Sequence, residues 1–172
     1  MPDLRDRARL EMAANGLRAA FSPESAAQVQ KVLQTYQGGQ GLDKFTISGK
    51  TRDLKNLLWS SVDNKESKDL DQIEYAEKLP DGRARVMIGI ADVDAFVPKG
   101  SPVDKEASDN TTSVYTGVIN FPMLPDKLSE DITSLLPDEE RLAMVYDLTF
   151  TDQGQVVESH VYPAIVINKA KL

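Results

Sequence analysis

Residues 63–74, which we call the acidic segment, concentrate the side chains best suited to chemistry: five carboxylates within twelve residues. Asp69 and Asp71 form an Asp-x-Asp pair, and in extended backbone such a pair points both carboxylates to the same side. Because like charges repel, the cluster favours a cation, and oxygen ligands without His or Cys favour Mg²⁺ or Mn²⁺. The spacing differs from that of an EF-hand. Taken alone, it favours a solvated acidic loop over a metal site.

The composition of the 172-residue chain is that of an ordinary globular protein. It is 41% hydrophobic, carries 20 basic and 27 acidic residues for a net charge of −7, and has one His and no Cys. The lack of Cys excludes disulfide frameworks, zinc knuckles and thiol nucleophiles. No stretch approaches the ~20 apolar residues of a membrane span, and the charged N-terminus does not resemble a signal peptide. We expect a cytoplasmic protein with no membrane partner, and we take it as a monomer.

The charge is unevenly distributed along the chain. Residues 1–50 carry 7 basic and 5 acidic groups, whereas residues 51–172 carry 13 basic and 22 acidic groups. Such an acidic body argues against a protein that holds polyanions by electrostatics alone, because phosphate binding draws on clustered Lys and Arg. Contact with nucleic acid would need metal ions, a local basic rim or a further part of the protein.

The N-terminal part has the pattern of two short helices. Apolar residues at helical spacing predict helices over residues 3–16 and 25–37, with Ser22 as the N-cap of the second. Residues 37–41 (Gln-Gly-Gly-Gln-Gly) have no apolar side chain to pack and are expected to form a linker. We expect residues 1–41 to be a small helical domain, either a helical hairpin docked on the main domain or a helix-turn-helix.

The remaining residues, 42–172, predict a mixed domain, so that the fold class is α+β. The apolar run from Val86 to Val93 is nearly continuous, as a strand buried on both faces requires. His160 lies in a strand pattern and is expected to be an exposed or satisfied strand residue. Strands are predicted at residues 45–47, 73–76, 85–93, 144–151 and 156–167, and helices at 102–113 and around 126–135.

Four blocks of sequence between Arg52 and Leu135 resemble, in their order, the RNB (ribonuclease II) family of 3′ to 5′ exoribonucleases. They are Arg52-Asp53-Leu54 with Ser61-Val62-Asp63; Lys68-Asp69-Leu70-Asp71; Ile90-Ala91-Asp92-Val93 with residues 97–104; and Thr112-Ser113-Val114-Tyr115 with residues 121–125, Leu128-Ser129 and Ser134-Leu135. A single Asp-x-Asp is common, but the ordered combination is specific. The chain is identified by this resemblance as the N-terminal part of such an enzyme, with a helical N-terminal domain in place of cold-shock domains.

The resemblance implies the roles of five residues. Asp63, Asp69 and Asp71 stand at three of the family's four acidic positions, and Gln72 stands at the fourth, where a family member usually has Asp. These four would bind Mg²⁺ or Mn²⁺, and Asp71 would orient or deprotonate the water that attacks the last phosphodiester of single-stranded RNA. Tyr115 matches the aromatic residue that stacks on a base near the scissile end. The implied activity is that of a metal-dependent exoribonuclease.

Two departures from the family pattern keep a second function open. With Gln72 at the fourth position, the metal binds more weakly, Glu74 compensates from the same strand face, or the activity is reduced. Family catalytic domains also continue beyond the matching region into a C-terminal half and, usually, an S1 RNA-binding domain, which we expect as partners of this chain. The alternative is a catalytically inert RNB-like module that binds RNA or a protein.

Overall fold

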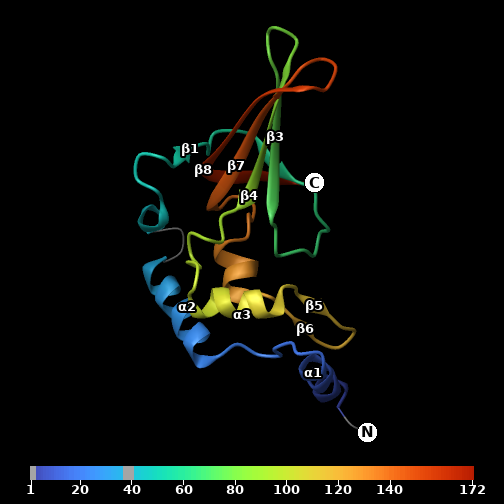
Figure 1. Ribbon diagram of the computed structural model, residues 1–172. Coiled ribbons are helices and arrows are strands. Elements are labelled where there is room, and N and C mark those ends of the chain that lie inside the picture. The colour runs from blue at the N-terminus through green and yellow to red at the C-terminus, as the bar shows by residue number, and fades with distance from the viewer. Residues whose placement is uncertain (1–2, 37–40) are drawn as a thin grey trace.

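The computed structural model describes residues 3–36 and 41–172 and has the α+β architecture expected from the sequence (Figure 1). Three helices lie at one end of the molecule, and two β-hairpins project at the other. The helices are α1 (Leu4–Ala14), α2 (Pro23–Thr35) and α3 (Pro102–Asn110), with a 3₁₀ turn η1 (Leu42–Phe45) and a π-helical turn η2 (Leu128–Ile132). Within these described ranges no helix has the length and apolar character needed to cross a membrane.

Six strands form one sheet in the order β1-β8-β2-β3-β4-β7, and β7 also pairs with β8. Strands β2, β3, β4, β7 and β8 therefore close into a circuit, which we call the strand ring. The strands are β1 (Arg52–Asp53), β2 (Trp59–Ser61), β3 (Gln72–Lys78), β4 (Ala84–Ala91), β7 (Glu140–Phe150) and β8 (Val156–Lys171), and a separate hairpin pairs β5 (Val114–Tyr115) with β6 (Asn120–Phe121). Closure depends on β8, because its 16 residues reach both β7 and β2.

Side chains alternate between the inside and the outside of the ring. In β4, Met87 and Gly89 are buried, whereas Ile88 between them is only half-buried. Gly89 leaves room for its neighbour on β3, since a Cβ at Gly89 would lie 3.1 Å from Cγ1 of Ile73. The expectation of a strand buried on both faces is therefore wrong, and the strand ends at Ala91.

Two hydrophobic clusters hold the elements together. The first fills the strand ring and includes Trp59, Leu70, Ile73, Met87, Leu135, Val145 and Val166, each at most 1% exposed. The second lies between the helices and the sheet and includes Val29, Val32, Phe96, Val103, Leu128 and Leu142. Because α2 contributes to the second cluster, its packing is continuous with that of the sheet domain.

The second helix begins as the sequence predicts and packs on α3. The Ser22 side chain accepts a hydrogen bond from the Ser25 N–H at 3.2 Å, which caps α2. Gln28 donates to Ser101 Oγ and accepts from the Val103 N–H, both at 3.0 Å. Helix α1 lies apart from α2 (Figure 1), so the two do not form the expected hairpin or helix-turn-helix. The division into residues 1–41 and 42–172 stays a prediction.

Three other sequence predictions concern a strand, a helix and a linker. The strand predicted at residues 45–47 is not formed: Phe45 ends η1, and its ring packs on Phe96 with centroids 4.6 Å apart. The helix predicted around 126–135 is formed over residues 126–132, of which 128–132 are the π-helical turn η2. The predicted linker lies outside the described residues except for Gly41, whose φ of +83° is left-handed.

We expect Gly41→Ala to lower the free energy of unfolding by ~3 kcal/mol, because a Cβ would combine an unfavourable φ with a collision with the Thr35 carbonyl oxygen. Gly49→Ala is the matched control: Gly49 has a φ of +72° but open space around it, so ~1 kcal/mol is expected. Urea denaturation of both variants measures the difference. Equal losses would show that Thr35 moves aside without cost.

Candidate functional site

The acidic segment joins β2 to β3, and the backbone holds it at both ends. The Asp63 N–H donates to the carbonyl of Leu172 at 3.4 Å. At the other end, the carbonyl of Asp71 accepts from the Ala91 N–H at 2.9 Å, and β3 begins at the next residue. Between them Leu70 is fully buried in the ring. These anchors involve backbone groups and an apolar side chain, so the carboxylates themselves are free to bind a ligand.

The carboxylates of the segment act on one another. Partial burial of the carboxyl group raises the pKa of Asp71, and the charges of Asp69 and then Asp63 raise it further. Burial and the charge of Asp63 likewise raise the pKa of Glu74. In the part of the chain that the structure describes, none of these four residues forms an ion pair. The nearby ammonium group of Lys171 donates to the carbonyls of Lys65 and Ser67 rather than to a carboxylate, so the negative charge of these four side chains is not paired.

The donor chemistry suits a hard divalent ion, but the geometry does not gather the ligands. Among residues 3–36 and 41–172, no three Asp, Glu or His side chains are placed to share a metal ion. Gln72 is exposed at the start of β3, where it pairs with Ile90 and shares a strand face with Glu74. The metal-ligand roles of Asp63, Asp69, Asp71 and Gln72 therefore stay predictions.

Tyr115 lies close to the acidic segment in space. It belongs to the β5–β6 hairpin, and its side chain is 70% exposed. Together with Lys68, Asp69, Asn120 and Pro122 it lines a cavity of about 400 Å³. The structure thus brings the predicted stacking residue and one predicted metal ligand to the same hollow, which the sequence could not show.

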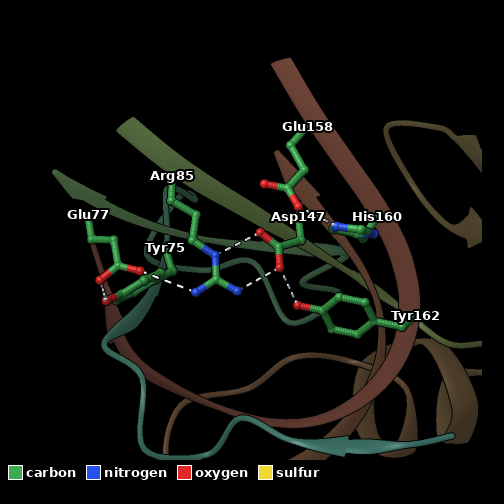
Figure 2. A network of polar contacts seen from close by, with 7 residues as sticks. All are labelled: Tyr75, Glu77, Arg85, Asp147, Glu158, His160 and Tyr162. Atoms are coloured by element: carbon green, nitrogen blue, oxygen red, sulfur yellow. Dashed lines mark hydrogen bonds and ion pairs between the residues drawn. The ribbon is translucent and has the colours of Figure 1, made fainter. Parts of the chain in front are cut away.

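A second group of charged side chains lies toward the hairpin end of the ring (Figure 2). Arg85 donates to both carboxylate oxygens of Asp147, at 2.8 and 2.7 Å, and Tyr162 donates to Asp147 at 2.7 Å. The hydrogen bond from Arg85 is the main reason that the pKa of Asp147 is lowered. His160 is exposed and pairs with Glu158 at 3.0 Å, as an exposed strand histidine would. Because these groups satisfy one another, we assign them to stabilising the strands.

Comparison with known proteins identifies the chain's family. Residues 51–172 match the RNB domain. The chain belongs to the RNB family. Ribonuclease R of Thermotoga maritima is 36% identical over 121 residues, which cover 70% of this chain and 17% of that protein. The solved RNase R of Mycoplasma genitalium in complex with double-stranded RNA superposes with a TM-score of 0.69 and 28% identity, over 87% of this chain and 29% of that one.

The RNB fold also occurs in a protein described as a pseudonuclease. Yeast Ssd1 superposes with a TM-score of 0.61 at 12% identity, over 88% of this chain and 21% of its own. Fold alone therefore does not decide whether an RNB chain cleaves RNA, and the side chains of the site must. The chain also spans less than a third of the length of each relative named here.

The structure adds to the site one residue, Ser134, to which the sequence motifs assigned no role. Ser134 belongs to a matched sequence block but carries no chemistry that suggests a role. In the structure its hydroxyl contacts the backbone on both sides of Asp69, at Lys68 and Leu70. The only sequence signal for it was its membership of that block.

We expect Asp71→Asn to raise the free energy of unfolding at pH 7 by ~0.5 kcal/mol, the size of screened surface interactions. A carboxyl whose pKa is raised by folding destabilises the fold once it ionises. The gain should therefore fade as the pH drops below the ordinary carboxyl pKa, where the parent is protonated as well. Urea denaturation at pH 7 and at pH 3 measures both values.

Asp81 supplies a control of opposite sign, because hydrogen bonds with Arg83 lower its pKa. Asp81→Asn should therefore lower the stability at pH 7. If Asp71→Asn is less stable than the parent at pH 7, repulsion among Asp63, Asp69 and Asp71 does not destabilise the fold.

Proposed function

We propose that this chain is the part of a cytoplasmic RNB exoribonuclease that holds the acidic residues and the stacking aromatic, and that the enzyme hydrolyses single-stranded RNA from the 3′ end. One observation carries the proposal: Asp69 of the acidic segment and the exposed Tyr115 line one cavity. A hollow with an aromatic face beside carboxylates suits a nucleotide whose base stacks while its phosphodiester faces the acidic side chains.

Tyr115 and Asp71 have different roles in the proposed reaction. Stacking on Tyr115 is indifferent to base identity, which suits an enzyme that must pass any sequence. Asp71 orients the attacking water or takes its proton. A divalent cation, Mg²⁺ or Mn²⁺, would neutralise charge on the phosphate and make the water more acidic.

Electrostatics support the need for that cation and for further protein. The cavity of Tyr115 is lined by Glu66, Asp69, Asp126 and Glu130, and by Lys68 as its single basic residue in the described part of the chain. A phosphate entering it meets net negative charge. We propose that a metal ion and a C-terminal part of the enzyme, including an S1 domain, supply the missing positive charge.

A second function rests on Gln72. A neutral amide at the fourth acidic position removes one negative ligand, which favours a catalytically inert RNB-like module that binds RNA or a protein. The two functions differ in one measurable respect, since only the enzyme releases nucleotides.

In the complete gene product, Asp71→Asn should lower kcat by ~10²-fold, equal to ~2.7 kcal/mol, while RNA affinity changes only a few-fold. The charge of Asp71 matters chiefly as the transition state forms, and an interaction of that kind appears in kcat. Single-turnover cleavage of a labelled single-stranded RNA with Mg²⁺ or Mn²⁺ gives the rate. Asp152→Asn, at an exposed carboxylate in the turn between β7 and β8 that does not line the cavity of Tyr115, is the control and should retain the parent rate.

If the Asp71→Asn variant cleaves RNA at the parent rate, Asp71 has no role in the reaction. A parent protein that binds single-stranded RNA but cleaves nothing with either metal would establish the inert module, and Gln72→Asp would then be the variant with which to restore cleavage.

Tyr115→Ala should weaken binding of a single-stranded RNA oligomer by ~1–3 kcal/mol, the value of one base stacked on an aromatic ring. Fluorescence anisotropy with a labelled oligonucleotide measures the affinity. Tyr146→Ala is the matched control, because Tyr146 is a 45% exposed tyrosine of β7 that does not line the cavity. Equal losses in the two variants would assign Tyr115 to packing.

A further inference from the structure

A buried two-residue turn, Ser134-Leu135, lies under the acidic segment. The Ser134 hydroxyl accepts from the Leu70 N–H at 2.9 Å and donates to the Lys68 carbonyl at 2.6 Å. The Leu135 N–H donates to the Leu70 carbonyl at 2.9 Å. Three hydrogen bonds therefore fix the backbone of residues 68–70, and Asp69 is the middle residue. Its side chain is exposed while the backbone on both sides of it is held from below.

Two buried side chains from different strands hold the Ser134-Leu135 turn in place. Arg141 of β7 donates from Nε to the Ser134 carbonyl at 2.8 Å, and Asn168 of β8 donates to the Leu135 carbonyl at 3.0 Å. They are 3% and 1% exposed. Each carbonyl of the turn thus accepts a side-chain hydrogen bond, and no buried side-chain polar atom in the described ranges lacks a partner.

The same two side chains reach beyond the turn. Arg141 Nη1 donates to the Tyr36 hydroxyl at 2.8 Å, and Tyr36 is the residue that ends α2. Asn168 Nδ2 also lies 3.1 Å from Ser61 Oγ, two residues before Asp63. The network therefore connects the C-terminal end of α2 with Ser61, just before the acidic segment, and with residues 68–70 inside it.

Packing alone does not explain this arrangement. Arg141 lies 3.5 Å from Glu139 and 3.9 Å from Asp131, so its charge is paired. Even a paired guanidinium group is costly to bury, and apolar residues of similar volume would fill the same space at less cost. The Ser134 hydroxyl holds the backbone on both sides of Asp69. Lys171 restrains the preceding part of the same segment, because its ammonium group donates to the carbonyls of Lys65 and Ser67. A segment of unneutralised carboxylates needs such an outside restraint to keep a single conformation.

We propose that Ser134 is a positioning residue that holds Asp69 at the cavity of Tyr115, and that Arg141 couples Ser134 to α2 through Tyr36. The consequence for RNA cleavage rests on the proposed function, whereas the positioning itself does not. The backbone that carries Asp69 would then be ordered before a ligand arrives, which lowers the cost of binding.

The experiment compares Ser134→Ala with Thr133→Val in this chain. Thr133 is the neighbouring buried hydroxyl, but it donates to the Leu128 carbonyl at 3.0 Å and so is the matched control. Amide hydrogen exchange is followed at Leu70, and at Val145 in the middle of β7 as a measure of global stability. Ser134→Cys, which keeps the size with weaker hydrogen bonds, is a milder second variant.

Ser134→Ala should speed exchange at Leu70 at least tenfold relative to Val145, with a smaller effect in Ser134→Cys, whereas Thr133→Val should change both amides alike. Calorimetric Mn²⁺ affinity should fall about tenfold in Ser134→Ala and stay at the parent value in Thr133→Val. Unchanged relative exchange at Leu70 in both Ser134 variants would overturn the proposal. A parent chain that binds no Mn²⁺ would count against the proposed function, and the exchange at Leu70 would still decide the positioning role.

Discussion

Closure of the strand ring by β8 is the constraint on which the site depends. β8 pairs with β7 along most of its length and with β2 near its end, so Ser61 is held beside Lys171. β3 is held by β4, with Gln72 opposite Ile90. The residues between Ser61 and Gln72 must bridge two fixed points at one end of the ring. That bridge is the acidic segment, which explains why carboxylates from a loop occupy a defined place.

Electrostatic repulsion between the carboxylates of the acidic segment destabilises the arrangement in which the fold holds them. Asp63, Asp69 and Asp71 repel one another: partial burial of the Asp71 carboxyl group raises its pKa, and the charges of Asp69 and Asp63 raise it further. Hydrogen bonds from Ser134 and the apolar anchor Leu70 oppose this repulsion through the backbone. A fold that sacrifices stability to keep like charges together is typical of functional sites, where charge is kept for a ligand rather than for the protein.

Much of the fold follows from local sequence, and much of the site does not. Strands β3, β4, β7 and β8 each have at least seven residues and are long enough to leave an apolar pattern in the sequence, although that pattern did not show the alternation of β4. Strands β1, β2, β5 and β6 have two or three residues and leave no pattern. Capping by Ser22 is a local interaction and was predictable. The identities of the acidic residues came from their resemblance to a family. The Ser134–Leu70 bond joins residues 64 positions apart, and periodicity carries no information about such pairs.

The late position of β8 in the chain also sets the order in which the site can form. Its last residues pair with β2, which was made much earlier, and long-range pairing of this kind waits for the whole intervening sequence. During synthesis, helices α1, α2 and α3, the β3–β4 hairpin and the antiparallel pairing of β2 with β3 can form from local contacts, but β2 lacks its second neighbour until β8 emerges. A nascent chain that has not yet made β8 therefore carries the aspartates on an open sheet rather than on a closed ring.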